Sequence, residues 1–253
     1  MAKIISVINQ KGGVGKTTTA VNLSACLGIL DKKVLLLDID PQGNSTSGYG
    51  INKRDNEYTS YDLFVNGADI HDCIKETKFK NVSIVSSNIN LTGVEIEILD
   101  IPQRERILKN AILPVLDEYD FIFLDCPPSL GLISLNALTA SDTFLVPIQA
   151  EYYALEGLSQ LMSTVRKIKI KYNQYIDIEG VLLTMFDGRL THSRQVTEEI
   201  KKFFPKKVYA TVIPRNVRLS EAPSYGEPIV YYDKRSSGAE SYMNLAKEFL
   251  RKQ

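Results

Sequence analysis

The 253-residue sequence contains no tryptophan, only two histidines and only three cysteines. The cysteines (Cys26, Cys73 and Cys126) are widely spaced and include no Cys-x-x-Cys pair, which argues against a disulfide framework or a zinc site. No segment reaches the roughly 18 apolar residues of a membrane-spanning helix, and the apolar run at the N-terminus is shorter than a signal-peptide core. We therefore expect a cytoplasmic protein that does not enter a membrane.

The sequence also lacks a net charge, since it has 30 Lys and Arg residues and 30 Asp and Glu residues. The molecule as a whole therefore has no electrostatic preference for nucleic acid or for an acidic membrane, and any such preference has to come from a local patch. Apolar residues make up 44% of the chain, enough for a sizeable core. No repeat or Pro/Gly/Ser-rich linker interrupts the sequence, so we expect one domain over residues 1–253.

Short apolar runs alternate with stretches of helical periodicity. The expected strands are residues 4–8, 34–37, 82–85, 121–124, 143–147, 178–184 and 208–212, and the expected helices are 17–30, 103–116, 155–171 and 193–203. This alternation predicts an α/β fold with a mostly parallel, twisted sheet and helices on both faces. Residues 48–81 are the least regular, and we expect them at the edge of the sheet.

Residues 9–18, "NQKGGVGKTT", nearly match the phosphate-binding pattern Gly-x-x-x-x-Gly-Lys-Ser/Thr. The pattern requires glycine at position 10, where this sequence has Gln10, and an additional lysine, Lys11, follows. An expected strand precedes the loop and an expected helix follows it, which is the context that a phosphate-binding loop requires. The alternative, a flexible glycine turn capped by threonine, fits this combination less well.

The loop residues have distinct expected roles. The glycines allow the backbone N–H groups to approach phosphate oxygens at a helix N-terminus. Lys16 would contact the β and γ phosphates of ATP, and the Thr17 hydroxyl would bind Mg²⁺. The nucleotide-binding residues expected in this loop are Lys11, Gly12, Gly13, Val14, Gly15, Lys16, Thr17 and Thr18.

Carboxylates follow two of the expected strands, at the sheet edge where α/β proteins bind ligands. Asp38 and Asp40 lie at the end of the second strand, and Asp40 could orient and deprotonate an attacking water, although Asp40-Pro41 could also simply begin a turn. Asp125 ends the strand "FIFLD" and occupies the position of a carboxylate that holds Mg²⁺.

The sequence resembles the ParA-family chromosome-partitioning ATPases of the Soj type, within the deviant Walker A group that also contains MinD and nitrogenase iron protein. The resemblance spans essentially the whole chain and rests on "KGGVGKTT", "DIDPQGN", "DCPPSLG", "EYYALEGL" and "IPRNVRLSEAP". It implies an ATP-dependent homodimer, bound to nonspecific double-stranded DNA of the nucleoid and stimulated by a ParB-type partner.

The resemblance also implies roles for single residues. It implies that Lys11 reaches the partner subunit's ATP across a two-fold dimer, and that Lys16 and Asp40 complete the catalytic set. It places residues 213–216 around the adenine, which adds Pro214, Arg215 and Asn216 to the nucleotide site. It assigns DNA binding to Arg189 and Arg218.

The charge distribution is uneven along the chain. Residues 166–218 contain twelve basic and five acidic side chains, a net charge of 12 − 5 = +7. Such a segment is a candidate surface for phosphate backbones, although a solvated helix face is the simpler interpretation.

Two other functions share parts of this pattern. A MinD-like ATPase would bind membranes, and the helical stripe in residues 238–253 could serve as its tail, but we expect this stripe to pack on the sheet. A metabolic enzyme that phosphorylates a small carboxylate would not need Lys11 or the basic segment. Cys126 could correspond to a cluster ligand of nitrogenase iron protein, but a buried small residue is the better interpretation.

Overall fold

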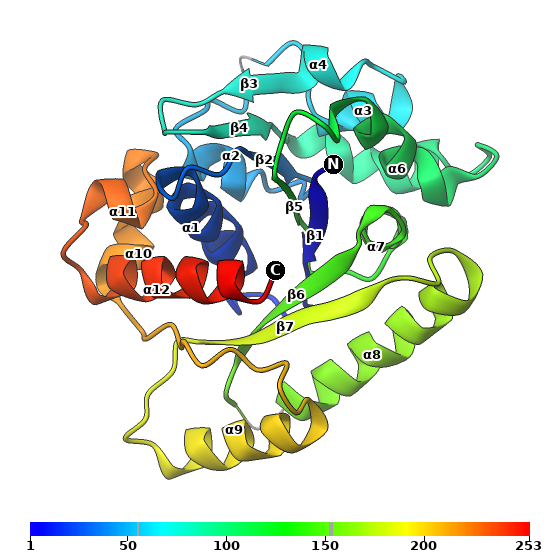
Figure 1. Ribbon diagram of the computed structural model, residues 1–253. Coiled ribbons are helices and arrows are strands. Elements are labelled where there is room, and N and C mark those ends of the chain that lie inside the picture. The colour runs from blue at the N-terminus through cyan, green and yellow to red at the C-terminus, as the bar shows by residue number, and fades with distance from the viewer. Residues whose placement is uncertain (55, 152–153) are drawn as a thin grey trace.

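The structure, a computed structural model, describes residues 1–54, 56–151 and 154–253 (Figure 1). It contains a seven-stranded sheet in the order β3-β4-β2-β5-β1-β6-β7, in which only the β3–β4 pair is antiparallel. The strands are β1 (Lys3–Val7), β2 (Val34–Asp38), β3 (Ile74–Glu76), β4 (Val82–Val85), β5 (Phe121–Asp125), β6 (Thr143–Gln149) and β7 (Asp177–Thr184). The predicted α/β fold with a mostly parallel sheet is confirmed.

Helices cover both faces of this sheet. The α-helices are α1 (Lys16–Ile29), α2 (Asn44–Gly48), α3 (Ser60–Val65), α4 (Ile70–Cys73), α5 (Val94–Glu97), α6 (Ile107–Ile112), α7 (Leu132–Ala140), α8 (Ala154–Lys171), α9 (Thr191–Phe203), α10 (Val217–Glu221), α11 (Ile229–Tyr232) and α12 (Ser237–Arg251). Among the described residues the 3₁₀ segments are η1 (Ile89–Gly93), η2 (Arg104–Arg106), η3 (Leu113–Val115) and η4 (Ala222–Tyr225).

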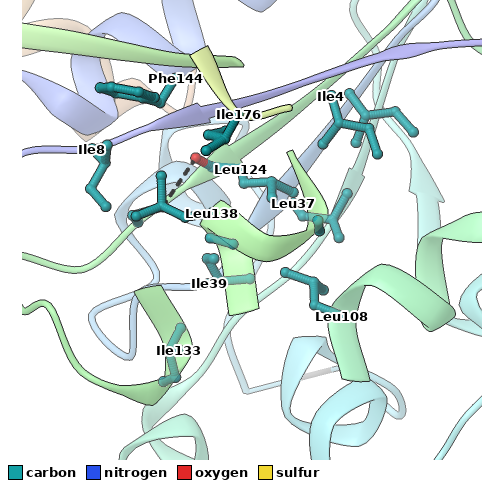
Figure 2. Close-up of a cluster of buried hydrophobic side chains, with 14 of the residues drawn as sticks. Ile4, Ile8, Leu37, Ile39, Leu108, Leu124, Ile133, Leu138, Phe144 and Ile176 are labelled. Carbon is teal, nitrogen blue, oxygen red and sulfur yellow. Dashed lines mark hydrogen bonds between the residues drawn. The ribbon is translucent and has the colours of Figure 1, made fainter. Parts of the chain in front are cut away.

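The two faces of the sheet form two hydrophobic clusters. Helices α3, α6, α7 and α8 pack on one face, where Figure 2 shows side chains from β1, β2, β5 and β6 meeting Leu108 of α6 and Leu138 of α7. Helices α1 and α12 lie side by side on the other face (Figure 1). In β2, alternate residues serve opposite clusters: Leu35 and Leu37 join the first, whereas Leu36 joins the second. Because both faces are buried, the central strands are apolar at consecutive positions.

Residues 48–81 lie at the sheet edge, as predicted. They form α3, α4 and the short strand β3, which pairs with β4 outside the parallel strands. Asp55 of this segment lies outside the described residues, as do Tyr152 and Tyr153 of the motif "EYYALEGL".

The predicted helix over residues 103–116 is wrong as a single element. The structure divides it into η2, α6 and η3. Gln103 has a left-handed backbone with φ of +56°, so the helical region starts only after it. At the other end, Pro114 lies in η3 and provides no N–H group to continue an α-helical hydrogen-bond ladder.

The predicted strand over residues 208–212 is also wrong. The chain runs beside β7 there but forms only isolated bridges, at Val208 and Pro214. Between these bridges, the N–H groups of Ala210 and Thr211 donate to the Glu248 carboxylate of α12 rather than to β7. An acceptor from a distant helix therefore interrupts the ladder.

The C-terminal stripe packs on the sheet, as expected. Tyr242, Leu245 and Phe249 of α12 are buried, and the Phe249 ring meets the ring of Phe121 edge-on at a centroid distance of 5.1 Å. Cys126 is fully buried, as predicted. Within the described residues, no helix combines the length and apolar character needed to cross a bilayer.

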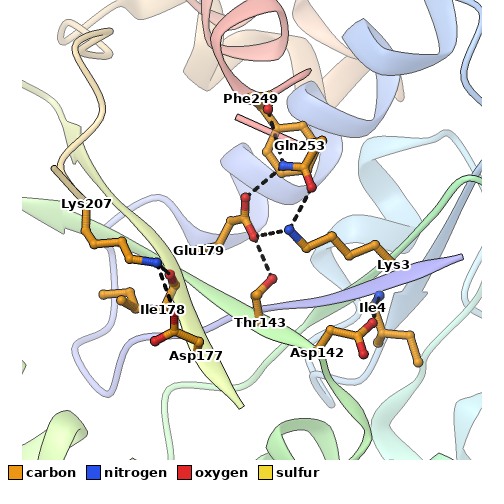
Figure 3. A network of polar contacts seen from close by, with 10 residues as sticks. All are labelled: Lys3, Ile4, Asp142, Thr143, Asp177, Ile178, Glu179, Lys207, Phe249 and Gln253. Atoms are coloured by element: carbon orange, nitrogen blue, oxygen red, sulfur yellow. Dashed lines mark hydrogen bonds and ion pairs between the residues drawn. The ribbon is translucent and has the colours of Figure 1, made fainter. Parts of the chain in front are cut away.

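The end of α12 is fixed to the amino ends of the strands by a polar network (Figure 3). The Glu179 carboxylate accepts hydrogen bonds from Thr143 and Gln253 and pairs with the Lys3 ammonium at 2.7 Å. Burial raises the pKa of Glu179, but the hydrogen bonds from Lys3, Thr143 and Gln253 outweigh it and hold the pKa below its usual value.

Phe249→Ala should lower the free energy of unfolding by about 3–5 kcal/mol, because it opens a cavity between α12 and β5. The measurement is urea denaturation of wild type and variant. Lys247→Ala is the matched control, since Lys247 is an exposed neighbour on the same helix and should change stability little. Equal stability of the two variants would show that α12 is not part of the core.

Candidate active site

The phosphate-binding loop connects β1 to α1, and its glycines have the backbone that the loop requires. Gly13 and Gly15 lie in the left-handed region with φ of +73° and +86°, which side chains disfavour. Gly15 directly precedes α1, so the partial positive charge of the helix N-terminus lies at the loop. The buried Val14 anchors the loop, because its carbonyl accepts a 2.7 Å hydrogen bond from the Thr184 hydroxyl at the end of β7.

A pocket of about 510 Å³ opens above this loop, a volume typical of small-molecule sites. Five segments of the chain, one of them represented by Pro128 alone, and Tyr242 of α12 enclose it. Its lining includes Gly12, Gly13, Gly15, Lys16, Thr17, Thr18, Asp40, Gln42, Asn44, Thr184, Met185, Ile213, Pro214, Arg215, Asn216 and Tyr242. The structure thus brings together most of the residues predicted for nucleotide binding.

Lys16 lies at the inner end of this pocket. Its side chain is largely buried, and its ammonium donates to the Lys11 carbonyl at 3.1 Å. Burial lowers the pKa of Lys16 below its usual value, although Asp125 opposes the shift. A cation held in a partly desolvated site interacts strongly with a phosphate group.

Asp38 and Asp125 end adjacent strands and pair with each other in the sheet register. Burial raises the pKa of both carboxyls. The Asp38 carboxylate raises the pKa of Asp125 further, and Asp40 adds to the shift of both. Two hydrogen bonds of 2.7 Å, donated by the N–H group and the hydroxyl of Thr46, stabilise the buried Asp38 carboxylate. Ser45 donates its hydroxyl to Asp125 Oδ2 at 2.7 Å.

The second carboxylate oxygen of Asp125, Oδ1, is buried and receives no comparable hydrogen bond among the described residues. The Thr17 hydroxyl acts on the same carboxyl, since it lowers the pKa of Asp125. A buried acceptor left without a donor beside a hydroxyl suits a hard cation, because Mg²⁺ prefers oxygen ligands.

Asp40 lies on the loop after β2 and lines the pocket. Its Oδ1 accepts the N–H group of Gln42 at 2.9 Å, and its carbonyl accepts the N–H group of Gly43 at 2.9 Å. The Ser87 hydroxyl also donates to the Asp40 carbonyl. Asp40 therefore does form the turn that the sequence allowed, and that turn fixes a carboxylate beside the phosphate loop.

Lys11 does not belong to the residues that line the pocket, as far as the described residues show. Its ammonium pairs with the Glu151 carboxylate at 2.5 Å, and its side chain is 44% exposed. The preceding Gln10, which replaces the usual glycine, donates to Gln160 and to the Gly157 carbonyl of α8. The chain thus holds Lys16 inside its own pocket and directs Lys11 outward.

Arg189 follows Phe186 and Arg218 follows Pro214 by a few residues. Phe186 and Pro214 form an isolated β-bridge, which brings the two segments together. Arg189 is 90% exposed and forms a two-point pair with Asp187. Arg218 pairs with Glu221 at 2.8 Å and Asp233 at 3.6 Å. Both arginines are therefore accessible, but both already have carboxylate partners.

Several residues that line the pocket were not predicted from the sequence, among them Thr184, Met185 and Tyr242. Thr184 ends β7 and carries a hydroxyl into the site, a feature that its position at a strand end could have suggested. Met185 has a left-handed backbone with φ of +48°, which is unusual for a non-glycine residue. Tyr242 reaches the pocket from α12, and its hydroxyl lies 3.2 Å from that of Thr19. No local signal marks Met185 or Tyr242.

Comparison with known proteins identifies the family to which the chain belongs. An AAA-domain family model matches residues 2–178. The sporulation initiation inhibitor protein Soj of Bacillus subtilis is 59% identical over 248 residues, covering 98% of each chain. The chromosome-partitioning ATPase Soj of Treponema pallidum is 44% identical and covers 99% of this chain and 98% of its own.

The chain belongs to the Soj/ParA family of chromosome-partitioning ATPases. The resemblance seen in its motifs is confirmed. Among solved structures, cobyrinic acid a,c-diamide synthase from Mycobacterium smegmatis with bound ATP analog and magnesium superposes with a TM-score of 0.87 at 31% identity. The superposition covers 99% of this chain and 95% of that one. This Soj/ParA-family chain therefore shares its fold with that protein over nearly the whole length of both chains.

Asp40→Ala should retain ATP binding and lose nearly all hydrolysis, because the loop backbone and Lys16 remain while the carboxylate beside the phosphate loop is removed. A general base typically contributes a factor of about 10² to 10⁴ in rate. The measurement is phosphate release under saturating Mg-ATP, together with nucleotide titration. Asp62→Ala, in the capping box of α3 outside the pocket, is the control. Turnover near the wild-type rate in Asp40→Ala would remove Asp40 from the mechanism.

Proposed function

We propose that this chain is an ATP-dependent dimerisation switch for chromosome or plasmid partitioning. Two subunits, each loaded with Mg-ATP, close on one another, the dimer binds double-stranded DNA without sequence preference, and slow hydrolysis separates the subunits. A ParB-type partner accelerates hydrolysis. The single observation that carries the proposal is the different placement of two loop lysines, with Lys16 buried at the pocket and Lys11 exposed outside it.

The pocket supports the ATP half of the proposal. The loop N–H groups and Lys16 would hold the phosphates, and Pro214, Arg215 and Asn216 would enclose the base. Thr17 and Asp125 would hold Mg²⁺, which neutralises charge on the phosphates when bound. Asp40 would accept a proton from the attacking water. The magnesium and ATP analogue bound to the cobyrinic acid a,c-diamide synthase support this assignment by likeness.

The position of Lys11 supports the dimer. Two triphosphates that face each other across a two-fold axis repel, so a dimer closed over ATP needs cations between them. Lys11 starts from an ion pair with Glu151, and exposed pairs contribute only about 0–1 kcal/mol. Exchanging Glu151 for a more highly charged phosphate is therefore favourable once a partner subunit supplies one.

The charge pattern supports DNA as the ligand. In residues 166–218 each of the five carboxylates pairs with a cation within the described chain. Seven of the twelve basic side chains then have no carboxylate partner among the described residues: Arg166, Lys167, Lys169, Lys171, Arg194, Lys206 and Arg215. Arg189 and Arg218 would exchange their exposed partners for DNA phosphates. The C-terminal helix α12 buries its apolar stripe in the core, so in this fold the stripe does not form a membrane-binding face.

Lys11→Ala should still bind ATP as a monomer, because Lys16, the loop backbone and the Mg²⁺ ligands remain. ATP-dependent dimerisation should fail, and ATP-dependent DNA binding with it. Lys16→Ala is the matched comparison and should lose nucleotide affinity itself. Nucleotide titration and light scattering of both variants give the result. A Lys11→Ala dimer as stable as wild type would refute this division of roles.

Arg189→Ala combined with Arg218→Ala should weaken binding to every duplex sequence about equally. If each arginine contacts one phosphate, each loss reduces the slope of log K against log salt by roughly 0.9. The control is Lys201→Ala with Lys202→Ala, which removes two cations that also have carboxylate partners. DNA binding with and without ATP is measured over a salt series, alongside anionic vesicles. An unchanged slope in the arginine variant, or ATP-dependent binding to vesicles instead of DNA, would contradict the proposal.

A further inference from the structure

The segment that leads into the nucleotide pocket contains a bulge opposite β7. The Tyr209 N–H group donates to the Val181 carbonyl, and the Ile213 N–H group donates to the Leu183 carbonyl. The segment therefore advances by 213 − 209 = 4 residues while β7 advances by 183 − 181 = 2. Two residues more than regular pairing allows are accommodated between these two hydrogen bonds, whereas an ordinary bulge inserts one.

Glu248 of α12 binds this bulge directly. Its Oε1 accepts the N–H group of Ala210 and its Oε2 accepts the N–H group of Thr211, both at 2.8 Å. Regular pairing would place Thr211 opposite the Leu183 carbonyl, where the bulge puts Ile213 instead. Glu248 is nearly buried and its charge is balanced by Lys252 at 3.0 Å. One carboxylate thus satisfies both donors, and charged acceptors form stronger hydrogen bonds than neutral ones.

The bulge determines which residues reach the pocket. Ile213 returns to β7, and Pro214, Arg215 and Asn216 follow directly as pocket lining. Side chains of an extended chain alternate with a period of two residues, so an insertion of two residues keeps the faces but displaces every later residue by two positions. Without the bulge, residues 212–214 would therefore take the places that residues 214–216 have at the pocket. The same helix also holds the far end of the segment, where Asn216 donates to the Ser237 hydroxyl at 2.8 Å.

We propose that Glu248 is a positioning residue of the nucleotide site, which fixes the bulge at Ala210 and Thr211 and thereby sets the register in which residues 214–216 meet the base. The inference rests on the proposed role of these residues around the base. Glu248 lies outside the pocket lining and contacts no part of the phosphate loop among the described residues. Substitution of Glu248 should therefore weaken the binding of the base and leave the binding of the phosphates unchanged.

The test compares Mg-ATP with inorganic triphosphate, which carries the phosphates without base or sugar. Titration calorimetry on Glu248→Ala should show affinity for Mg-ATP weakened roughly tenfold, the equivalent of one charge-assisted hydrogen bond, and affinity for Mg-triphosphate unchanged. Glu248→Gln keeps the size of the side chain and one acceptor oxygen, so it should lie between Glu248→Ala and wild type.

Glu179→Ala is the matched control. Glu179 is as buried as Glu248, and it holds Gln253 near the end of α12 (Figure 3). It lies nearer the other end of β7 and, among the described residues, it forms no hydrogen bond with the bulge and does not line the pocket. This variant should lower the melting temperature and leave both affinities unchanged. Equal weakening of ATP and triphosphate in Glu248→Ala, or no weakening of ATP, would overturn the inference.

The wild-type protein tests the underlying assignment separately. It should bind Mg-ATP more tightly than Mg-triphosphate, because residues 214–216 contact the base. Equal affinities in wild type would overturn both the assignment and the inference. Discrimination in wild type that Glu248→Ala retains would overturn the inference alone.

Discussion

The site depends on the burial of two carboxylates side by side. Asp38 and Asp125 end neighbouring parallel strands in register, away from water, where like charges are costly. The surrounding chain compensates them: Ser45 and Thr46 start α2 against them, and Lys16 lies close enough for its pKa to respond to Asp125. The hydrogen bond from the Ser87 N–H group to the Thr46 hydroxyl then connects this cluster to the loop that holds Asp40. The residues that stabilise the two buried carboxylates therefore also fix the position of Asp40, the proposed catalytic carboxylate.

The same arrangement gives the two loop lysines different environments. Lys16 is the first residue of α1 and faces the buried carboxylates, so its position follows from the loop and the sheet. Lys11 comes before the left-handed glycines, where Gln10 fastens the chain to α8 and turns the next side chain toward Glu151. A glycine at position 10 could not make this attachment. The departure from the ordinary phosphate loop and the outward direction of Lys11 are thus connected.

Much of the fold could be predicted because the central strands are buried on both faces and read as continuous apolar runs. Helix α7 gave no periodic signal, since the polar residues of "LISLNALTA" (Ser134, Asn136 and Thr139) are spread around the helix and do not form one face. Strand β3, "IKE", is too short and too polar to be distinguished from a loop. The places of the loop glycines, Asp40 and Asp125 in the fold could be predicted, because each lies at or just after the end of an apolar strand run in the sequence. Tyr242, Met185 and the bulge could not, because they depend on contacts between β7, the segment beside it and α12, which only the folded chain brings together.

The irregular segment beside β7 has a consequence for the sheet as a whole. An exposed, regular edge strand offers unpaired N–H and C=O groups to another sheet, which leads to uncontrolled polymerisation. Here residues 207–214 cover the β7 edge but bend away from regular pairing at Ala210 and Thr211, and the opposite edge ends in the three-residue strand β3. Neither edge presents a long, straight template to which a further strand could add. A protein with such sheet edges can bind other molecules through its loops and helices without adding their strands to its sheet.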